Sequence, residues 1–259
     1  MLALKQEKQK KESPKSKNRR CRPVVISMLL LQLLFESAGL ARGGEARQSE
    51  DRGLGTIVGH VRLMGPYEKP GRLPVYKNLD FCGSSVADES LLVHGAGGVK
   101  NVAVTILGAG AQPRKPAGRI VLDNKACRFV PHVQVAPVGS EILLKNSDPI
   151  LHDVHARMGP ETLFNVGLPA WRQVAQTLTR PGIVAIQCEV LHTWMSAYIV
   201  VTSSPYFAVS GEDGRFAIEG VPPGEYEVDF WHEKLGRQSR KVVVKPEEET
   251  VADVVFAAP

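Results

Sequence analysis

The chain has 259 residues, a formal net charge of +5, and 43% hydrophobic residues. Residues 1–41 hold nine Lys and Arg against three Glu, so this leader carries +6 and residues 42–259 carry about −1. The main part of the chain is therefore close to neutral, which argues against nucleic-acid binding through a basic surface.

The leader has the layout of an export signal. A long basic stretch precedes thirteen mostly apolar residues, 23–35, and small residues follow at 37–41. Thirteen residues are too few to span a bilayer comfortably, so we predict a cleaved signal peptide, a periplasmic or otherwise exported protein, and no stable membrane span after cleavage. An uncleaved anchor is the alternative.

The rest of the chain is a succession of short β-branched runs separated by Gly, Pro, Asn and Asp. No segment has a long helical period, so the pattern predicts an all-β fold of sandwich type. The expected strands are 55–63, 102–107, 120–122, 133–135, 141–144, 173–178, 183–188, 197–201, 215–218, 225–230, 241–244 and 252–256.

Two segments in the middle of this succession carry metal-binding side chains. The expected strand 141–144 runs on to Asn146, and His152 follows six residues later. Between the expected strands 183–188 and 197–201, one short loop brings together Cys188, His192 and Met195. Two imidazoles, a thiolate and a weak axial thioether favour a single copper ion and electron transfer over harder metals.

The strand order and these residues resemble the cupredoxin (blue copper) family, and amicyanin most closely, over residues 117–203. The resemblance implies a Greek-key β-sandwich in which His152, Cys188, His192 and Met195 bind copper. It also implies a one-electron carrier of the methylamine-utilisation type, with dehydrogenase or cytochrome partners. The Cys-to-His interval of three residues lies between the two and four common in the family, while the His-to-Met interval of two is amicyanin-like.

Three neighbours of the expected ligands are candidates for supporting roles. Asn146 could brace the site by hydrogen bonding. His155 lies three residues beyond His152 on an extended segment, so the two side chains should point to opposite faces and only one should bind metal. Trp194 could shield the metal from water, or could simply pack in the loop.

The cysteines suggest an oxidising compartment. Cys21 leaves with the leader, and if Cys188 binds metal, then Cys82 and Cys127 remain as a possible disulfide. The alternative is that Cys82 and Cys127 are separate thiols that are not in contact.

Residues 213–233 contain D-G-R-F-A-I and V-P-P-G-E-Y, which resemble the second half of carboxypeptidase-regulatory-like, transthyretin-like domains. The opening half of such a domain resembles the runs at 55–61 and 101–107. We therefore expect one discontinuous transthyretin-like β-sandwich, 55–107 together with 205–259, with the cupredoxin-like domain 117–203 inserted between its halves. The rival arrangement is an enlarged cupredoxin, 52–203, followed by a small tail domain.

The sequence thus predicts an exported electron-transfer protein with one copper ion, not an enzyme. It contains no Ser/His/Asp order, phosphate loop, paired-acid motif or H-E-x-x-H. Two alternatives remain. One is a non-redox envelope protein that contacts carbohydrate or protein, and the other is a copper capture or delivery protein.

Overall fold

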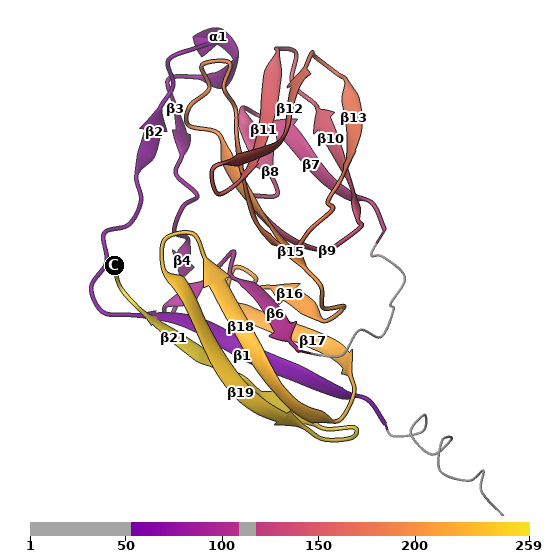
Figure 1. Ribbon diagram of the computed structural model, residues 1–259. Helices are drawn as coiled ribbons and strands as arrows, with labels where there is room; N and C mark the ends of the chain where they lie inside the picture. Colours follow the sequence, from indigo (N-terminus) through magenta and orange to yellow (C-terminus); the bar gives the residue numbers. More distant parts are fainter. Residues whose placement is uncertain (1–52, 109–117) are drawn as a thin grey trace, which may run out of the picture. The chain divides into compact units, whose positions relative to one another are not determined.

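The computed structural model describes residues 53–108 and 118–259, all of which belong to one compact unit, Gln48–Pro259 (Figure 1). The described chain is almost entirely β-structure, which confirms the predicted fold class. Its elements are β1 (Gly55–Met64), β2 (Arg72–Pro74), α1 (Leu79–Cys82), β3 (Ser85–Ala87), β4 (Val93–His94), β5 (Gly98–Val99), β6 (Ala103–Leu107), β7 (Ile120–Lys125), β8 (Arg128–Val130), β9 (Val133–Pro137), β10 (Glu141–Asn146), β11 (His152–Met158), β12 (Glu161–Leu168), β13 (Gln173–Thr177), β14 (Gly182–Gln187), β15 (Ser196–Thr202), β16 (Phe207–Val209), β17 (Arg215–Val221), β18 (Gly224–His232), β19 (Gly236–Val244), β20 (Glu249–Val251) and β21 (Val254–Ala257).

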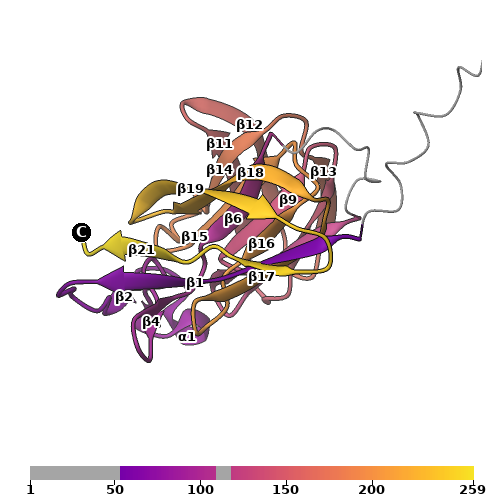
Figure 2. The same ribbon diagram turned by 90° about the horizontal axis from the view of Figure 1, so that it is seen from below.

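Strands from the two ends of the described chain form one pair of sheets. β1 pairs antiparallel with β17 and parallel with β20 and β21. Figure 2 shows β17 and β21 beside β1 from below. The other sheet has the order β16-β6-β18-β19. β17 alternates buried Phe216 and Ile218 with exposed neighbours, as expected for a strand with one solvated face. These side chains share a core with Val104, Val228 and Phe230 from the facing sheet.

The middle of the chain forms a second pair of sheets. One has the order β13-β10-β7-β8 and the other β12-β11-β14-β15-β9. Along β10, buried Ile142 and Leu144 alternate with partly exposed residues, and buried Asn146 takes the third inward position. Val154 of β11 and Ile186 of β14 face the same core.

The segment of residues 72–87, which we call the arm, joins the second core although it follows β1 in the chain. β2 and β3 pair with each other, and α1 lies in the connection between them, at one end of the pair (Figure 1). Val75 and Val86 of the arm are buried in the core of the middle sheets. The predicted domain bounds group these residues with 55–107, and the sequence carries no signal for their packing in this core.

The two cores are joined by a smaller apolar cluster. It contains Ala103 of β6 and Trp231 of β18 together with Val133, Val135 and Val200 from β9 and β15.

The predicted export signal lies outside the described residues. No helix within residues 53–108 and 118–259 is long and apolar enough to cross a membrane.

Candidate metal centre

The candidate site forms where β11 begins and β14 ends. β11 pairs antiparallel with β14, so the start of β11 lies beside the residue that follows β14. His152 is the first residue of β11, and Cys188 is the first residue after β14. The main-chain N–H of Asp153 lies 3.4 Å from Cys188 Sγ, and the N–H of Glu189 donates to Asp153 Oδ1 over 3.3 Å.

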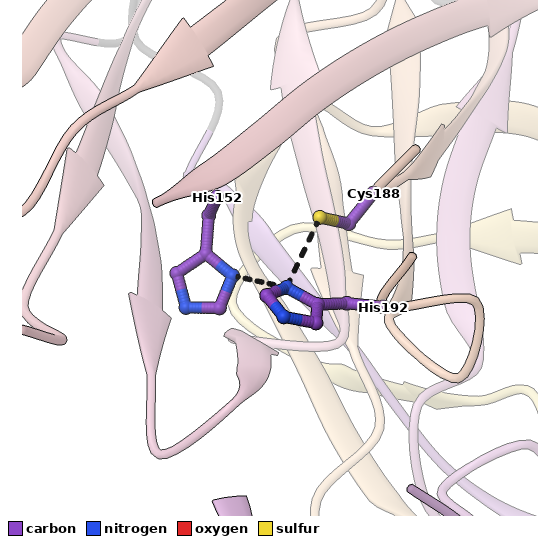
Figure 3. A group of neighbouring side chains, drawn as sticks. All are labelled: His152, Cys188 and His192. Carbon is purple, nitrogen blue, oxygen red and sulfur yellow. Dashed lines mark hydrogen bonds between the residues drawn. The ribbon is translucent and has the colours of Figure 1, made fainter. Parts of the chain in front are cut away.

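The loop from Cys188 to Met195 turns back so that His192 faces both other donors. His192 Nδ1 lies 3.1 Å from His152 Nδ1 and 3.6 Å from Cys188 Sγ (Figure 3). The three residues are almost completely buried, with exposed fractions of 0% for His152, 2% for Cys188 and 1% for His192. Two imidazole nitrogens and one sulfur therefore converge on a single point inside the protein.

The outer nitrogens of both rings are held by hydrogen-bond acceptors. His152 Nε2 lies 2.9 Å from Asp148 Oδ2, and His192 Nε2 lies 2.8 Å from Asn78 Oδ1. A carboxylate or amide oxygen can only accept, so each neutral ring carries its proton on Nε2. Both Nδ1 atoms then present lone pairs to each other. A cation between the two rings would bind both lone pairs and the sulfur of Cys188.

The separations match the edges of a metal coordination shell. Metal–nitrogen bonds of about 2.0 Å and metal–sulfur bonds of about 2.3 Å, at angles near 110°, separate two nitrogens by roughly 3.3 Å and a sulfur from a nitrogen by roughly 3.6 Å. The observed 3.1 and 3.6 Å agree with these lengths. Outer ring N–H groups bound to oxygen acceptors are also the usual support of metal-binding histidines. The three side chains therefore fit a metal ion.

Met195, the expected axial ligand, is buried in the same core cluster as Cys188 and is 2% exposed. Its N–H donates to His192 O over 2.9 Å and closes the loop before β15 begins. Its thioether as a fourth ligand stays a prediction.

Burial shifts the pKa values of the donors in opposite directions. Burial raises the pKa of the Cys188 thiol, although the N–H of Asp153 partly opposes this. Burial lowers the pKa of His192 to about 4, and the positive charge of Lys77 acts in the same direction. Both shifts favour neutral groups in the metal-free protein.

Asp148 and Asn146 build the support beneath His152. Burial by itself would raise the pKa of Asp148, but hydrogen bonds from His152 and from two main-chain N–H groups lower it below its ordinary value. Asn146 Oδ1 accepts from the Asp148 N–H over 2.9 Å, and its Nδ2 donates to Ile150 O and Leu168 O over 2.8 Å each. Asn146 thus fixes the turn that presents Asp148 to the ring.

His155 lies away from the converging donors. Its Nε2 lies 2.8 Å from Thr162 Oγ1, and its Nδ1 pairs with Glu189. Among the described residues, His155 belongs to no group of three potential metal-binding side chains.

Trp194 packs beside the site. Its ring centre lies 5.1 Å from that of His192, and its Nε1 donates to Cys127 O over 3.0 Å. Cys127 forms a disulfide with Cys82, with Cα atoms 5.6 Å apart. Cys127, Asp148 and His152 also form a close group, but the disulfide sulfur is not a thiolate donor.

Asp148 and Asn78 are not among the site residues that the sequence predicts. Asp148 carried a local signal, because N-S-D between a strand and a histidine is a typical turn. Asn78 lies 114 residues from His192 and carried none.

No protein-family model matches the chain, and no curated protein matches it either. Solved structures similar to it include cupredoxins. A copper-containing nitrite reductase from Thermus scotoductus SA-01 is 24% identical over 38% of this chain and 25% of that chain, with a TM-score of 0.31. A purple cupredoxin from Nitrosopumilus maritimus is 19% identical over 33% of this chain and 100% of that chain, with a TM-score of 0.29. A reduced mutant of amicyanin is 22% identical over 38% of this chain and 98% of that chain, with a TM-score of 0.30.

This chain spans only a quarter of the nitrite reductase. At these TM-scores, the case for the metal centre depends on its own geometry. The transthyretin-like resemblance stays a prediction.

Proposed function

We propose that this chain is an exported protein that binds one copper ion and carries single electrons between redox partners. One observation carries the proposal: the Nδ1 atoms of His152 and His192 face each other and Cys188 Sγ inside the protein, while both Nε2 atoms are bound to acceptors. Two imidazoles and a thiolate beside a buried Met195 are the donor set that favours copper in electron transfer.

The protein would supply a rigid, dry set of donors. Copper held by these residues would supply one-electron chemistry. His152 is fixed by strand β11 and Asp148, while Cys188 and His192 are fixed by a loop whose ends enter β14 and β15. Donors held in this way need little rearrangement when the charge of the site changes.

Burial of the donors favours a carrier over a catalyst. His152, Cys188, His192 and Met195 are each at most 2% exposed, so a substrate has little access to the ion. Because a dry site exchanges electrons and not atoms, its partners would be redox proteins, and the cupredoxin resemblance implies the dehydrogenase or cytochrome type.

Two further features support the proposed location and organisation. A disulfide between Cys82 and Cys127 suits an oxidising compartment outside the cytoplasm. The strands of 55–107 and 205–259 pair with each other, which supports a discontinuous module with residues 117–203 inserted in it.

The test is the visible and EPR spectrum of residues 42–259 after addition of Cu(II). We expect an intense sulfur-to-copper charge-transfer band that disappears in Cys188→Ser and in His192→Gln. The matched control is His94→Gln, because His94 is exposed and distant in the fold, on β4. A colourless protein identical to Cys188→Ser would overturn the proposal and leave a non-redox binding role.

A further inference from the structure

We propose that Asn78 is a positioning residue for His192, carried by an arm that a disulfide locks over the metal centre. Its amide oxygen holds the His192 ring in the tautomer that directs Nδ1 toward the metal, and the arm keeps water from the ring. The effect of Asn78 on copper binding rests on the proposed copper site. The contact between Asn78 and His192 does not depend on the metal.

The contact is direct and comes from outside the sheets that carry the ligands. Asn78 Oδ1 lies 2.8 Å from His192 Nε2, whereas the neighbouring Leu191 is 63% exposed. The loop that carries His192 is therefore at the surface, and His192 itself is 1% exposed. The arm lies beside this loop in Figure 1.

The backbone of Asn78 is fixed by the short helix that follows it. Asn78 precedes α1 in a left-handed conformation, with φ 54° and ψ 42°. Its carbonyl oxygen accepts from the N–H of Phe81 over 3.0 Å and of Cys82 over 2.9 Å. These bonds tie the position of Asn78 to that of Cys82.

Cys82 is in turn bound to the turn between β7 and β8. Its partner, Cys127, follows β7. On either side of α1, Val75 and Val86 of the arm are buried in the adjacent core. Just beyond the arm, Glu89 pairs with Arg128 over 3.1 Å. The tip of the arm therefore cannot move far from His192 while the disulfide is intact.

The same turn also holds the other histidine. The main-chain N–H groups of Ala126 and Cys127 donate to Asp148 over 2.7 and 2.9 Å, and Asp148 binds His152 Nε2. One disulfide thus links the acceptor of the His192 ring with the acceptor of the His152 ring. The relative orientation of the two rings depends on that link.

The experiment compares two substitutions of Asn78. Asn78→Gly removes the amide but tolerates the left-handed backbone, and Asn78→Asp keeps an oxygen acceptor. Asn101→Gly is the matched control, because Asn101 also has a positive φ of 66° but belongs to the other pair of sheets, next to β6. Two readouts are used: the His192 tautomer from imidazole nitrogen NMR of the metal-free protein, and the rate at which bound Cu(II) passes to a competing chelator.

We expect metal-free wild type, Asn78→Asp and Asn101→Gly to carry the His192 proton on Nε2, and Asn78→Gly to show a mixture of tautomers. We expect copper release from Asn78→Gly to be at least about tenfold faster, since loss of such support typically weakens metal binding 10–100-fold. Asn78→Asp should restore slow release and lower the reduction potential, because its charge favours Cu(II).

An Nε2–H tautomer in Asn78→Gly with wild-type copper release would overturn the inference. Wild type that binds no copper, with the tautomer change still present in Asn78→Gly, would overturn the proposed function and keep the positioning role. The double variant Cys82→Ser/Cys127→Ser should shift both readouts in the same direction as Asn78→Gly. Unchanged readouts in a folded double variant would overturn the locking role of the disulfide.

Discussion

Binding of the proposed copper ion would require Cys188 to lose a proton but not His192. Burial raises the pKa of Cys188 above its ordinary value near 9.0 and lowers that of His192 to about 4. Between these values the thiol is protonated and the imidazole is neutral, so binding of one ion releases the thiol proton. We expect the affinity for copper to fall about tenfold for each unit of decreasing pH in this range.

Below about pH 4, His192 must lose a proton as well, and the fall should steepen to at least about a hundredfold per unit. Chelator competition at several pH values measures both slopes. An affinity independent of pH between 5 and 8 would show that the thiol of Cys188 takes no part in binding.

For single residues, the sequence was sufficient to select the three converging donors but not the oxygen acceptors that hold their rings. His152, Cys188 and His192 stood out because soft donors recurred at the ends of predicted strands. Asn78 and Asp148 did not, because an oxygen that accepts from an outer ring nitrogen can come from any polar residue. Only the folded structure shows that the acceptor for His192 is Asn78 of the arm.

β1 and β5 lie very close to the turn that precedes β17, and Gly214 is in this turn. A Cβ at Gly214, whose φ is 82°, would lie 2.3 Å from Val61 O and 2.8 Å from Val99 N. Gly236, with φ 75°, has no atom within 4 Å of the same position. The two glycines share a left-handed backbone, but only Gly236 has room for a Cβ atom.

We therefore expect Gly214→Ala to lower the free energy of unfolding by about 3–5 kcal/mol, because backbone atoms must move. Gly236→Ala should cost only about 1–2 kcal/mol, from the left-handed conformation alone. Urea denaturation of both variants measures the difference. Equal losses would mean that the backbone around Gly214 relaxes freely.

Strands with regular alternation, such as β10 and β17, could be predicted from the sequence because half of their residues face a core. β11 was harder to predict, because its sequence H-D-V-H-A-R-M places polar side chains at inward positions. His152 is the first residue of β11, whereas none of the predicted strands includes it. The short strands of the arm, with three residues each, offer too little alternation for a prediction.

For the whole molecule, strand pairing gives a test of the discontinuous module. Within residues 205–259, β18–β19 is the only strand pair. β17, β20 and β21 pair with β1, while β16 and β18 pair with β6. A lone hairpin is marginally stable at best in water.

We therefore expect an isolated 205–259 fragment to show no cooperative unfolding in urea, followed by circular dichroism, while residues 42–259 unfold cooperatively. A cooperative transition of the fragment would instead favour an independent tail domain after an enlarged cupredoxin.

The stability of the whole molecule should also depend on pH through His232, on β18. Burial lowers its pKa to about 4, and the charges of His132 and Lys234 act in the same direction. Its Nδ1 accepts from the N–H groups of Lys234 and Leu235 over 3.2 and 3.4 Å, so a proton on Nδ1 would break both bonds. The folded pKa lies below the ordinary 6.5, so the unfolded chain binds the proton more readily.

This contribution is fully present above about pH 6.5 and is lost as the pH falls toward 4, with a total of about 3 kcal/mol. His232→Asn keeps an acceptor for the two N–H groups and removes the titration, so the metal-free variant should lose less stability on acidification than metal-free wild type. His192 acts in the same direction and leaves a residual slope. His94→Asn, on the exposed end of β4, serves as the control and should retain the wild-type dependence. Parallel wild-type and His232→Asn curves from pH 7 to 4, measured by urea denaturation, would show that His232 is protonated without cost in the folded protein.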